Sequence, residues 1–261
     1  MSGGAIRAAL AAGRPSIGIG QLWPGGMVAE RTGAAGYDWV LLDCQHGGHT
    51  EDGLQAAVQG VALGGGEALV RVGSNDARLI GRALDCGAAG VIVPMVDDAE
   101  AARAAAAAVR YPPLGQRSFG PLRGAFAGTG EANERVLCLV MIESVEAMSN
   151  LEAIVSTPGV DGVYFGPVDL AISMGLPANV AAIDPAVLDA AAEVAAACER
   201  HGVIPGSFSL GPEQAEQLLE RGMRLLALGS ELALFMRGAA ADLERAAELK
   251  ERYRRGQDAT G

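Results

Sequence analysis

Residues 68–95 read ALVRVGSNDARLIGRALDCGAAGVIVPM, and the order of patterns in this stretch decides the fold. An apolar run at 68–72 is followed by a segment with helical spacing and then by a second apolar run at 90–95. A polar residue within 74–76 can cap the N-terminus of the helix, and Gly87 can end it. The stretch therefore predicts a strand, a helix and a second strand that runs parallel to the first.

The same alternation recurs along the whole chain. Its apolar runs are continuous, as expected for parallel strands that are covered on both faces. They lie at 17–21, 39–43, 68–72, 90–95, 137–143, 162–166, 203–207 and 225–230. Eight strands that alternate with helices predict an α/β fold, a (β/α)8 TIM barrel forming a single domain over residues 1–261, with about the last ten residues frayed. A doubly wound sheet is the alternative, because sequence does not reveal strand order.

The composition of the chain argues against several classes of protein. The net charge of −11 argues against nucleic acid as a partner, because such binding needs a basic surface. No stretch approaches the ~20 apolar residues that span a membrane, and no signal peptide is evident, so a cytoplasmic protein is predicted. The four cysteines are far apart and form no zinc motif or disulfide framework. The connection Pro112–Arg135 is unusually long, which predicts a functional or mobile loop.

Polar residues that follow the predicted strands indicate where the chemistry lies, since active sites of such barrels form at the carboxyl ends of the strands. Glu143 and Asp169 follow neighbouring strands, and their oxygens would suit Mg²⁺ or Mn²⁺. Alternatively, each carboxylate is satisfied locally, Glu143 by a helix N-terminus and Asp169 as an N-cap. The residues alone leave both interpretations open.

Arg71 lies within an apolar strand and needs an anionic partner. That partner is either a substrate carboxylate or enolate oxygen, or one of the two carboxylates above in a structural ion pair. His46 could act as a general base whose ring is oriented by Asp43; the alternatives are a zinc ligand with His49 or an ordinary loop histidine. The only lysine, Lys250, is predicted to lie in a solvated terminal helix, which argues against Schiff-base chemistry.

Longer motifs resemble the HpcH/HpaI aldolases from about residue 15 to residue 237. The resemblance is carried by GYDWVLLDCQHG at 36–47, RYPPLGQRSFG at 110–120 and IESVEAMSNLEAIVSTPGVDGVYFGPVDL at 142–170. Members of this family are metal-dependent class II pyruvate aldolases built on the (β/α)8 barrel. They are commonly hexamers in which paired subunits exchange a helix. The resemblance therefore implies a homohexamer and a divalent metal, Mg²⁺, Mn²⁺ or Co²⁺.

The resemblance also assigns roles to the GPVD turn and to the carboxylates. It implies that Glu143 and Asp169 bind the metal, while the turn at Gly166 presents the backbone N–H groups of Val168 and Asp169 to the pyruvate carboxylate. An acid that resembles Asp85 contributes from an adjacent subunit in that family. A carboxylate near the C-terminal end of its predicted helix opposes the helix dipole.

The remaining implied roles fall on the second and third strands. Arg71 matches the arginine that binds the substrate, and His46 matches the catalytic histidine, with Asp43 beside it. The chain departs from the family at Gln45, where typical members have glutamate, and at Met141, where several have glutamine. These departures bear on the aldehyde partner more than on the metal.

The predicted function is the reversible aldol cleavage of 4-hydroxy-2-oxo acids to pyruvate, or hydroxypyruvate, and an aldehyde. A citramalyl- or malyl-CoA-type lyase is one alternative, although the acidic chain shows no basic rim for the phosphates of CoA. A non-catalytic barrel that binds an oxo acid is another, because a fold does not fix a function.

Overall fold

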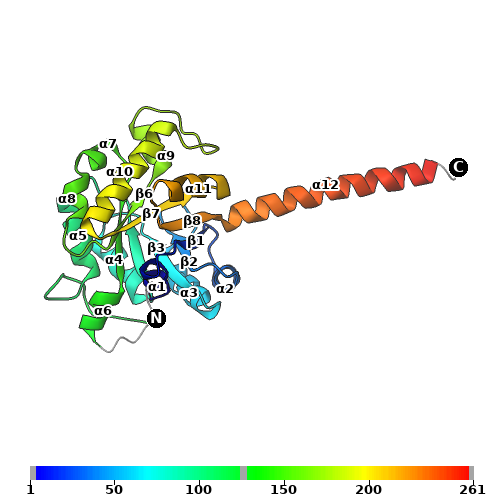
Figure 1. Ribbon diagram of the computed structural model, residues 1–261. Coiled ribbons are helices and arrows are strands. Elements are labelled where there is room, and N and C mark those ends of the chain that lie inside the picture. The colour runs from blue at the N-terminus through cyan, green and yellow to red at the C-terminus, as the bar shows by residue number, and fades with distance from the viewer. Residues whose placement is uncertain (1–3, 124–127, 259–261) are drawn as a thin grey trace.

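Eight parallel strands close into one barrel in the computed structural model, which describes residues 4–123 and 128–258 (Figure 1). Each strand pairs with its neighbours in sequence, and the last pairs with the first. The strands are β1 Ser16–Gln21, β2 Trp39–Asp43, β3 Glu67–Arg71, β4 Gly90–Val93, β5 Leu137–Ile142, β6 Gly162–Phe165, β7 Ile204–Ser209 and β8 Leu225–Ser230. The predicted (β/α)8 barrel is therefore confirmed, and closure of the sheet rules out the doubly wound alternative.

Helices surround the barrel, and several of them begin at a side-chain cap. Asp76 accepts hydrogen bonds from the backbone N–H groups of Arg78 and Leu79 and so caps α4, as predicted from the opening stretch. Gly87, two residues beyond the end of α4, has the positive φ that ends the helix. The helices are α1 Gly4–Ala11, α2 Gly26–Gly33, α3 Glu51–Leu63, α4 Ala77–Asp85, α5 Ala99–Val109, α6 Thr129–Arg135, α7 Val145–Ser149, α8 Leu151–Val155, α9 Pro167–Ser173, α10 Pro185–His201, α11 Pro212–Glu220 and α12 Glu231–Asp258.

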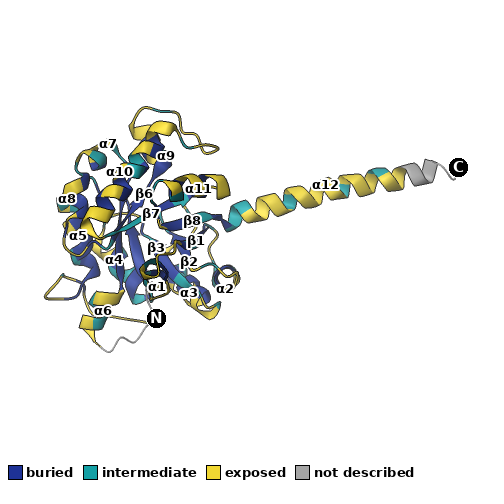
Figure 2. Ribbon diagram, viewed as in Figure 1, coloured by how far each residue is buried: buried dark blue, intermediate teal, exposed yellow. Residues whose placement is uncertain are grey.

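The hydrophobic core has two layers, visible as the buried centre of the molecule in Figure 2. The larger layer lies between the strands and the surrounding helices, and the smaller one fills the barrel itself. Trp39 fills part of the interior because Gly18 faces it on β1; a Cβ at Gly18 would lie 2.3 Å from the Trp39 ring. Ile6 of α1 packs into the same inner layer and closes the amino end of the barrel.

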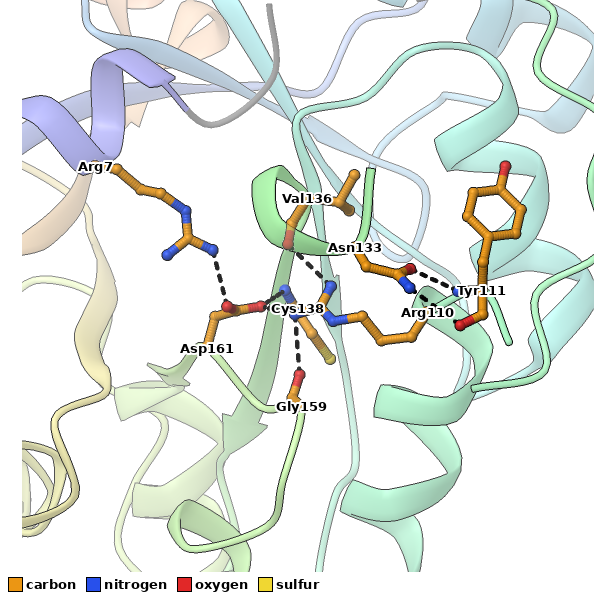
Figure 3. A network of polar contacts seen from close by, with 8 residues as sticks. All are labelled: Arg7, Arg110, Tyr111, Asn133, Val136, Cys138, Gly159 and Asp161. Atoms are coloured by element: carbon orange, nitrogen blue, oxygen red, sulfur yellow. Dashed lines mark hydrogen bonds and ion pairs between the residues drawn. The ribbon is translucent and has the colours of Figure 1, made fainter. Parts of the chain in front are cut away.

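A polar network also joins segments at the amino end of the barrel (Figure 3). Asp161, just before β6, forms ion pairs with Arg7 of α1, at 2.8 Å, and with Arg110, which follows α5. Its Oδ2 also accepts a hydrogen bond from the backbone N–H of Cys138 at 2.7 Å. Arg110 donates further hydrogen bonds to the carbonyl oxygen of Val136 and to that of a neighbouring glycine. Every element that meets here is tied to Asp161 or Arg110.

The long connection at 112–135 is partly ordered by its own hydrogen bonds. The backbone N–H of Gln116 donates to the carbonyl of Ala107, and the N–H groups of Leu122 and Arg123 both donate to the carbonyl of Asp85. The connection ends in α6, and residues 124–127 lie outside the described residues. Its first half therefore lies against α4 and α5 instead of forming an open loop.

The chain ends in one long helix that leaves the barrel (Figures 1 and 2). α12 has 28 residues and begins directly after β8, not near residue 244 where the charged tail becomes evident in sequence. Most of its described side chains are exposed, including the apolar Phe235 and Leu243. The helix is described to Asp258, and residues 259–261, part of the end that was expected to be frayed, lie outside the described residues. No helix in the described parts of the chain is long and apolar enough to cross a membrane.

Candidate active site

A cavity of about 740 Å³ opens at the carboxyl ends of the strands. Its polar side is formed by Asp43, His46, Arg71 and Asp169, which are four of the residues that the sequence singled out. Its other side is apolar and includes the segment between α9 and α10, residues 174–184. The cavity therefore lies where the barrel fold predicts the chemistry.

Asp43 and Arg71 form a bidentate ion pair on the floor of the polar side. The parallel register places the two residues opposite each other at the ends of β2 and β3. Arg71 donates from Nε to Oδ1 at 2.9 Å and from Nη2 to Oδ2 at 2.5 Å. Burial alone would raise the pKa of Asp43, but the Arg71 guanidinium and two backbone N–H groups outweigh it, and the pKa is lowered. The structural partner of Arg71 is thus Asp43, not Glu143 or Asp169 as the alternative interpretation held.

Asp43 acts on His46 through the backbone, which corrects the expected contact with the imidazole ring. Its Oδ1 accepts hydrogen bonds from the N–H groups of Gln45 and His46 at 3.0 and 3.2 Å. The His46 side chain is exposed and lines the cavity. The turn is tight, because a Cβ at Gly47 would lie 2.4 Å from the carbonyl oxygen of Asp43. Asp43 therefore fixes the loop that carries His46 and leaves the ring free to meet a ligand.

His49 lies in the loop between β2 and α3 and is buried there. It is 5% exposed, and burial lowers the pKa of its ring. It lines a separate cavity of about 280 Å³ beside Cys44 and does not line the large cavity. Within the described residues, no three histidine, cysteine or acidic side chains are grouped as a metal would need, so nothing supports a zinc site that pairs His49 with His46.

Glu143 follows β5 and is only 4% exposed. Its Oε1 accepts a hydrogen bond of 2.7 Å from the backbone N–H of Met95, which follows β4. Met95 has a φ of 55°, a conformation that costs free energy for a residue with a side chain and that is typical of functional sites. Burial raises the pKa of Glu143; the Met95 N–H opposes the shift and the charge of Asp169 adds to it. A buried carboxylate is thus held at the site at the expense of backbone strain.

Asp169 lies in the first turn of α9, which begins after Gly166. Gly166 is the N-cap, so Asp169 is not the cap that its alternative interpretation required. Gly166 also leaves space over Glu143, because a Cβ there would lie 2.8 Å from the Glu143 Cβ and 3.1 Å from its Oε2. The pairing of β5 with β6 ends at Ile142 and Phe165, so the residues that follow, Glu143 and Gly166, are neighbours. The two predicted metal ligands are therefore near one another.

Asp85 does not line the cavity of its own chain. It ends α4, and its Oδ1 accepts a hydrogen bond of 2.9 Å from Nη2 of Arg117. The Arg117 guanidinium lies 4.6 Å from the centre of the Tyr111 ring. Both residues belong to the RYPPLGQR motif, so part of that motif positions Asp85.

Other polar residues near the strand ends act as helix caps. Asp98 caps α5, accepting from the N–H of Ala101 at 2.7 Å, and Ser144 caps α7. Tyr164, which the sequence did not single out, is buried and lines the floor of the cavity; within the described chain its hydroxyl has no hydrogen-bond partner. The sequence could have indicated this residue, because it is a tyrosine within an otherwise apolar strand.

Comparisons with known proteins agree with this geometry. The HpcH/HpaI aldolase/citrate lyase family matches residues 26–238. A 2-dehydro-3,6-dideoxy-6-sulfogluconate aldolase from Pseudomonas putida is 37% identical, over 80% of this chain and 83% of its own. A 4-hydroxy-2-oxo-heptane-1,7-dioate aldolase from Salmonella arizonae is 37% identical, over 91% of this chain and 92% of its own.

A solved structure shares the fold closely. The citrate synthase SbnG has a TM-score of 0.84 and 27% identity, over 94% of this chain and 98% of its own. The aldolase-named relatives cover most of the chain, and the family covers both the Asp43–Arg71 pair and the Glu143–Asp169 pair. This chain belongs to the HpcH/HpaI aldolase/citrate lyase family and is a carbon–carbon lyase.

Proposed function

We propose that the enzyme is a divalent-metal-dependent class II aldolase that cleaves 4-hydroxy-2-oxo acids to pyruvate, or hydroxypyruvate, and an aldehyde. The observation that carries the proposal is that Asp169 and Arg71 line one cavity at the carboxyl ends of the strands, with the buried Glu143 packed against Gly166, which also lines that cavity. Two hard oxygen donors and one fixed guanidinium suit a substrate that presents a carboxylate and a keto oxygen side by side.

The chemistry of the donor set fits Mg²⁺, Mn²⁺ or Co²⁺. No donor among the described residues reaches Oε2 of Glu143, and Gly166 packs so closely against this side chain that a Cβ there would lie 3.1 Å from Oε2. Asp169 is exposed at the cavity. Such metals commonly bind through one or two carboxylates and complete their shell with water and substrate oxygens. Bound by Glu143 and Asp169, the metal would supply Lewis-acid stabilisation to the oxygen on which enolate charge develops.

The protein's own groups would bind the oxo acid and handle the proton. In α9 the N–H groups of Val168 and Asp169 belong to the first turn, where no intrahelical acceptor exists, and both residues line the cavity. They would hold the substrate carboxylate. Arg71 uses Nε and Nη2 for Asp43, and among the described residues none accepts from its Nη1. That nitrogen would donate to the keto oxygen as it becomes an enolate oxygen.

Bond cleavage would then proceed from the hydroxyl at C4. His46, exposed in the cavity on the loop that Asp43 fixes, would take the hydroxyl proton. The C3–C4 bond would break, the aldehyde would form at C4, and the electron pair would pass into the enolate of pyruvate. Protonation at C3 completes the release of pyruvate. Asp85, paired with Arg117 in its own chain, would contribute to the site of an adjacent subunit.

A CoA-thioester lyase is less well supported. Arg71 is the one arginine or lysine that lines the cavity within the described chain, and Asp43 already binds it. The phosphates of CoA would need further cations.

We also propose that the enzyme is a cytoplasmic homohexamer in which α12 is exchanged between paired subunits. The exposed apolar side chains along α12 support an intermolecular position for it. Light scattering of the full-length protein tests the assembly. A mass six times that of the chain is expected, and a monomer would contradict it.

The test of the reaction is pyruvate release from a 4-hydroxy-2-oxo acid by chelated protein, before and after Mg²⁺, Mn²⁺ or Co²⁺ is added. Activity should be lost with the metal and return with it. Glu143→Gln is the control, because it keeps an oxygen for the Met95 N–H but should not regain activity on metal addition. Turnover that is unaffected by chelation, or no pyruvate under any condition, would contradict the proposal.

A further inference from the structure

The cavity has a polar side and an apolar side. The segment between α9 and α10, the end of β7 and the loop after it form a largely apolar wall, and Asp184 at the end of that segment is its charged side chain. Its apolar residues are Pro177, Val180, Ala182, Ile183, Phe208 and Leu210. The oxo-acid groups of the proposed function occupy the opposite, polar side. The wall therefore faces the part of the substrate that leaves as the aldehyde.

The apolar wall is built into the fold. Gln214 of α11 is buried and bridges its two parts. Its Oε1 accepts from the backbone N–H of Leu210 at 3.0 Å, and its Nε2 donates to the carbonyl oxygen of Val180 at 3.1 Å. Asn179 adds a turn, since its Oδ1 accepts from the N–H of Ala181 at 2.9 Å. The backbone polar groups of the wall are therefore partly satisfied within it, and its apolar side chains remain for a ligand.

Charge at this wall disfavours an anionic aldehyde. The charged side chains that line the cavity within the described chain are Asp43, Asp169, Asp184 and Arg71. Of these, Asp184 lies at the apolar side, where it caps α10, and it would repel an anion. Arg71 lies at the other side and is held by Asp43. A distal carboxylate or sulfonate would lose water at the wall without gaining a cation.

We propose that the aldehyde of this enzyme is uncharged and carries a short apolar chain. The inference rests on the proposed aldolase function and specifies its acceptor. It sets the chain apart from its two aldolase relatives, since a heptane-1,7-dioate and a 6-sulfogluconate each carry a distal acid group. Each methylene buried against the wall should improve kcat/KM by about fourfold.

The experiment compares aldehydes in the addition direction with pyruvate and Mg²⁺ or Mn²⁺. Pentanal and succinic semialdehyde have backbones of similar length and differ in the charge at the far end. Pentanal should have at least about a tenfold higher kcat/KM, and the series propanal, butanal and pentanal should rise. Equal values, or a preference for succinic semialdehyde, would overturn the inference.

A second readout separates this inference from the proposed function. Exchange of the C3 hydrogens of pyruvate with D₂O, followed by NMR, reports enolate formation without any aldehyde. Exchange together with a preference for the charged aldehyde would overturn the acceptor inference alone. Absence of exchange and of all aldol products would overturn the proposed function.

A charge-introducing variant sharpens the test. Val180 is 61% exposed, so Val180→Arg can be accommodated without disturbing the core. It should shift the ratio of kcat/KM for succinic semialdehyde to that for pentanal by about tenfold toward the charged aldehyde. Val180→Met, which is long but neutral, is the matched control and should keep the order of the parent enzyme. The same ratio in the arginine and methionine variants would contradict the proposal.

Discussion

Each end of the barrel carries an aspartate–arginine pair. The two ends differ in the hydrogen-bond partners that the charged side chains find within the described chain. At the amino end, Asp161 receives hydrogen bonds from Arg7, Arg110 and the backbone N–H of Cys138 (Figure 3). Arg110 in turn donates to two carbonyl oxygens. Asp161 and both Nη atoms of Arg110 have partners in the network, as a buried ion pair needs in order to stabilise a structure, whereas Nε of Arg7 has none among the described residues.

At the carboxyl end the arginine of the corresponding pair meets one acceptor residue, where Arg110 meets three. Arg71 gives two of its nitrogens to Asp43, and none of the described residues accepts from the third. Glu143 has one oxygen on the Met95 N–H, and its other oxygen accepts no hydrogen bond from the described residues. Similar side chains thus stabilise the fold at one end and remain available for a ligand at the other, as the division of labour in such barrels predicts.

Removing the charge of Glu143 tests the carboxyl end most strongly. In Glu143→Gln the amide oxygen still accepts from Met95, but one of the two proposed metal ligands loses its charge. Aldol turnover should fall by at least about 10³-fold, since metal-assisted charge stabilisation contributes several kcal/mol. Calorimetric titration with Mn²⁺ should show weaker binding than in the parent enzyme. Parent-like turnover with weakened metal binding would contradict the assignment.

Asp161→Asn tests the opposite end. It leaves Arg110, which is buried, without its anionic partner, so the free energy of unfolding should fall by about 3–5 kcal/mol. Because Asp161 is remote from the cavity, kcat should change little while the protein is folded. Arg7→Gln is the control in the same network. Arg7 is less buried than Arg110, with 40% of its side chain exposed against 7%, and its loss should cost less than about 1 kcal/mol in urea unfolding. Equal costs for the two variants would contradict this ranking.

The strands and several helix caps could be predicted because their signals are local. All eight apolar runs are strands, and α4 begins at a cap within the predicted residues 74–76. α12 was less visible, since the residues after Ser230 are apolar and only its distal half reads as a charged helix. The direction in which α12 leaves the barrel depends on tertiary contacts, which cannot be read from a single sequence.

Several residues that the sequence singled out line the cavity, but the sequence did not show how their side chains pair. Which carboxylate meets Arg71 depends on the register of β2 against β3, and a one-residue change would have moved Asp43 away. The strained Met95 and the buried His49 are likewise consequences of tertiary packing. The sequence shows which side chains are charged or polar, whereas the fold determines which of them contact one another.

Arg71→Lys sharpens the comparison of the two arginines. Lysine keeps the charge next to Asp43 but loses the planar fork that binds a carboxylate through two nitrogens and leaves a third for the substrate. Turnover should fall by about 10²-fold, with a smaller loss of stability than in Asp161→Asn. Steady-state kinetics with pyruvate as the varied substrate would check it. Unchanged turnover would mean that the charge of Arg71, and not its geometry, is what the site uses.

The pH dependence of stability gives the smallest effect and separates the two carboxylates of the active end. Burial raises the pKa of Glu143 above its unfolded value near 4.5, so between the two values the folded protein binds more protons than the unfolded chain. Its contribution is therefore lost as pH rises through the folded pKa. Asp43 has a lowered pKa, and its contribution is lost only as pH falls below its unfolded value near 3.8.

Urea unfolding of the chelated parent and of Glu143→Gln between pH 4.5 and 7.5 would resolve these signs. The variant lacks the buried charge, so its stability advantage should be absent near pH 4.5 and should grow as pH rises toward neutrality. Adding Mg²⁺ at pH 7.5 should reverse the order, because a cation favours the charged carboxylate of the parent. A difference that stays constant across this range would show that Glu143 is no less well solvated than an exposed carboxylate. In that case the two ends of the barrel would differ in shape, but the free-energy cost of burying a charged side chain would not distinguish them.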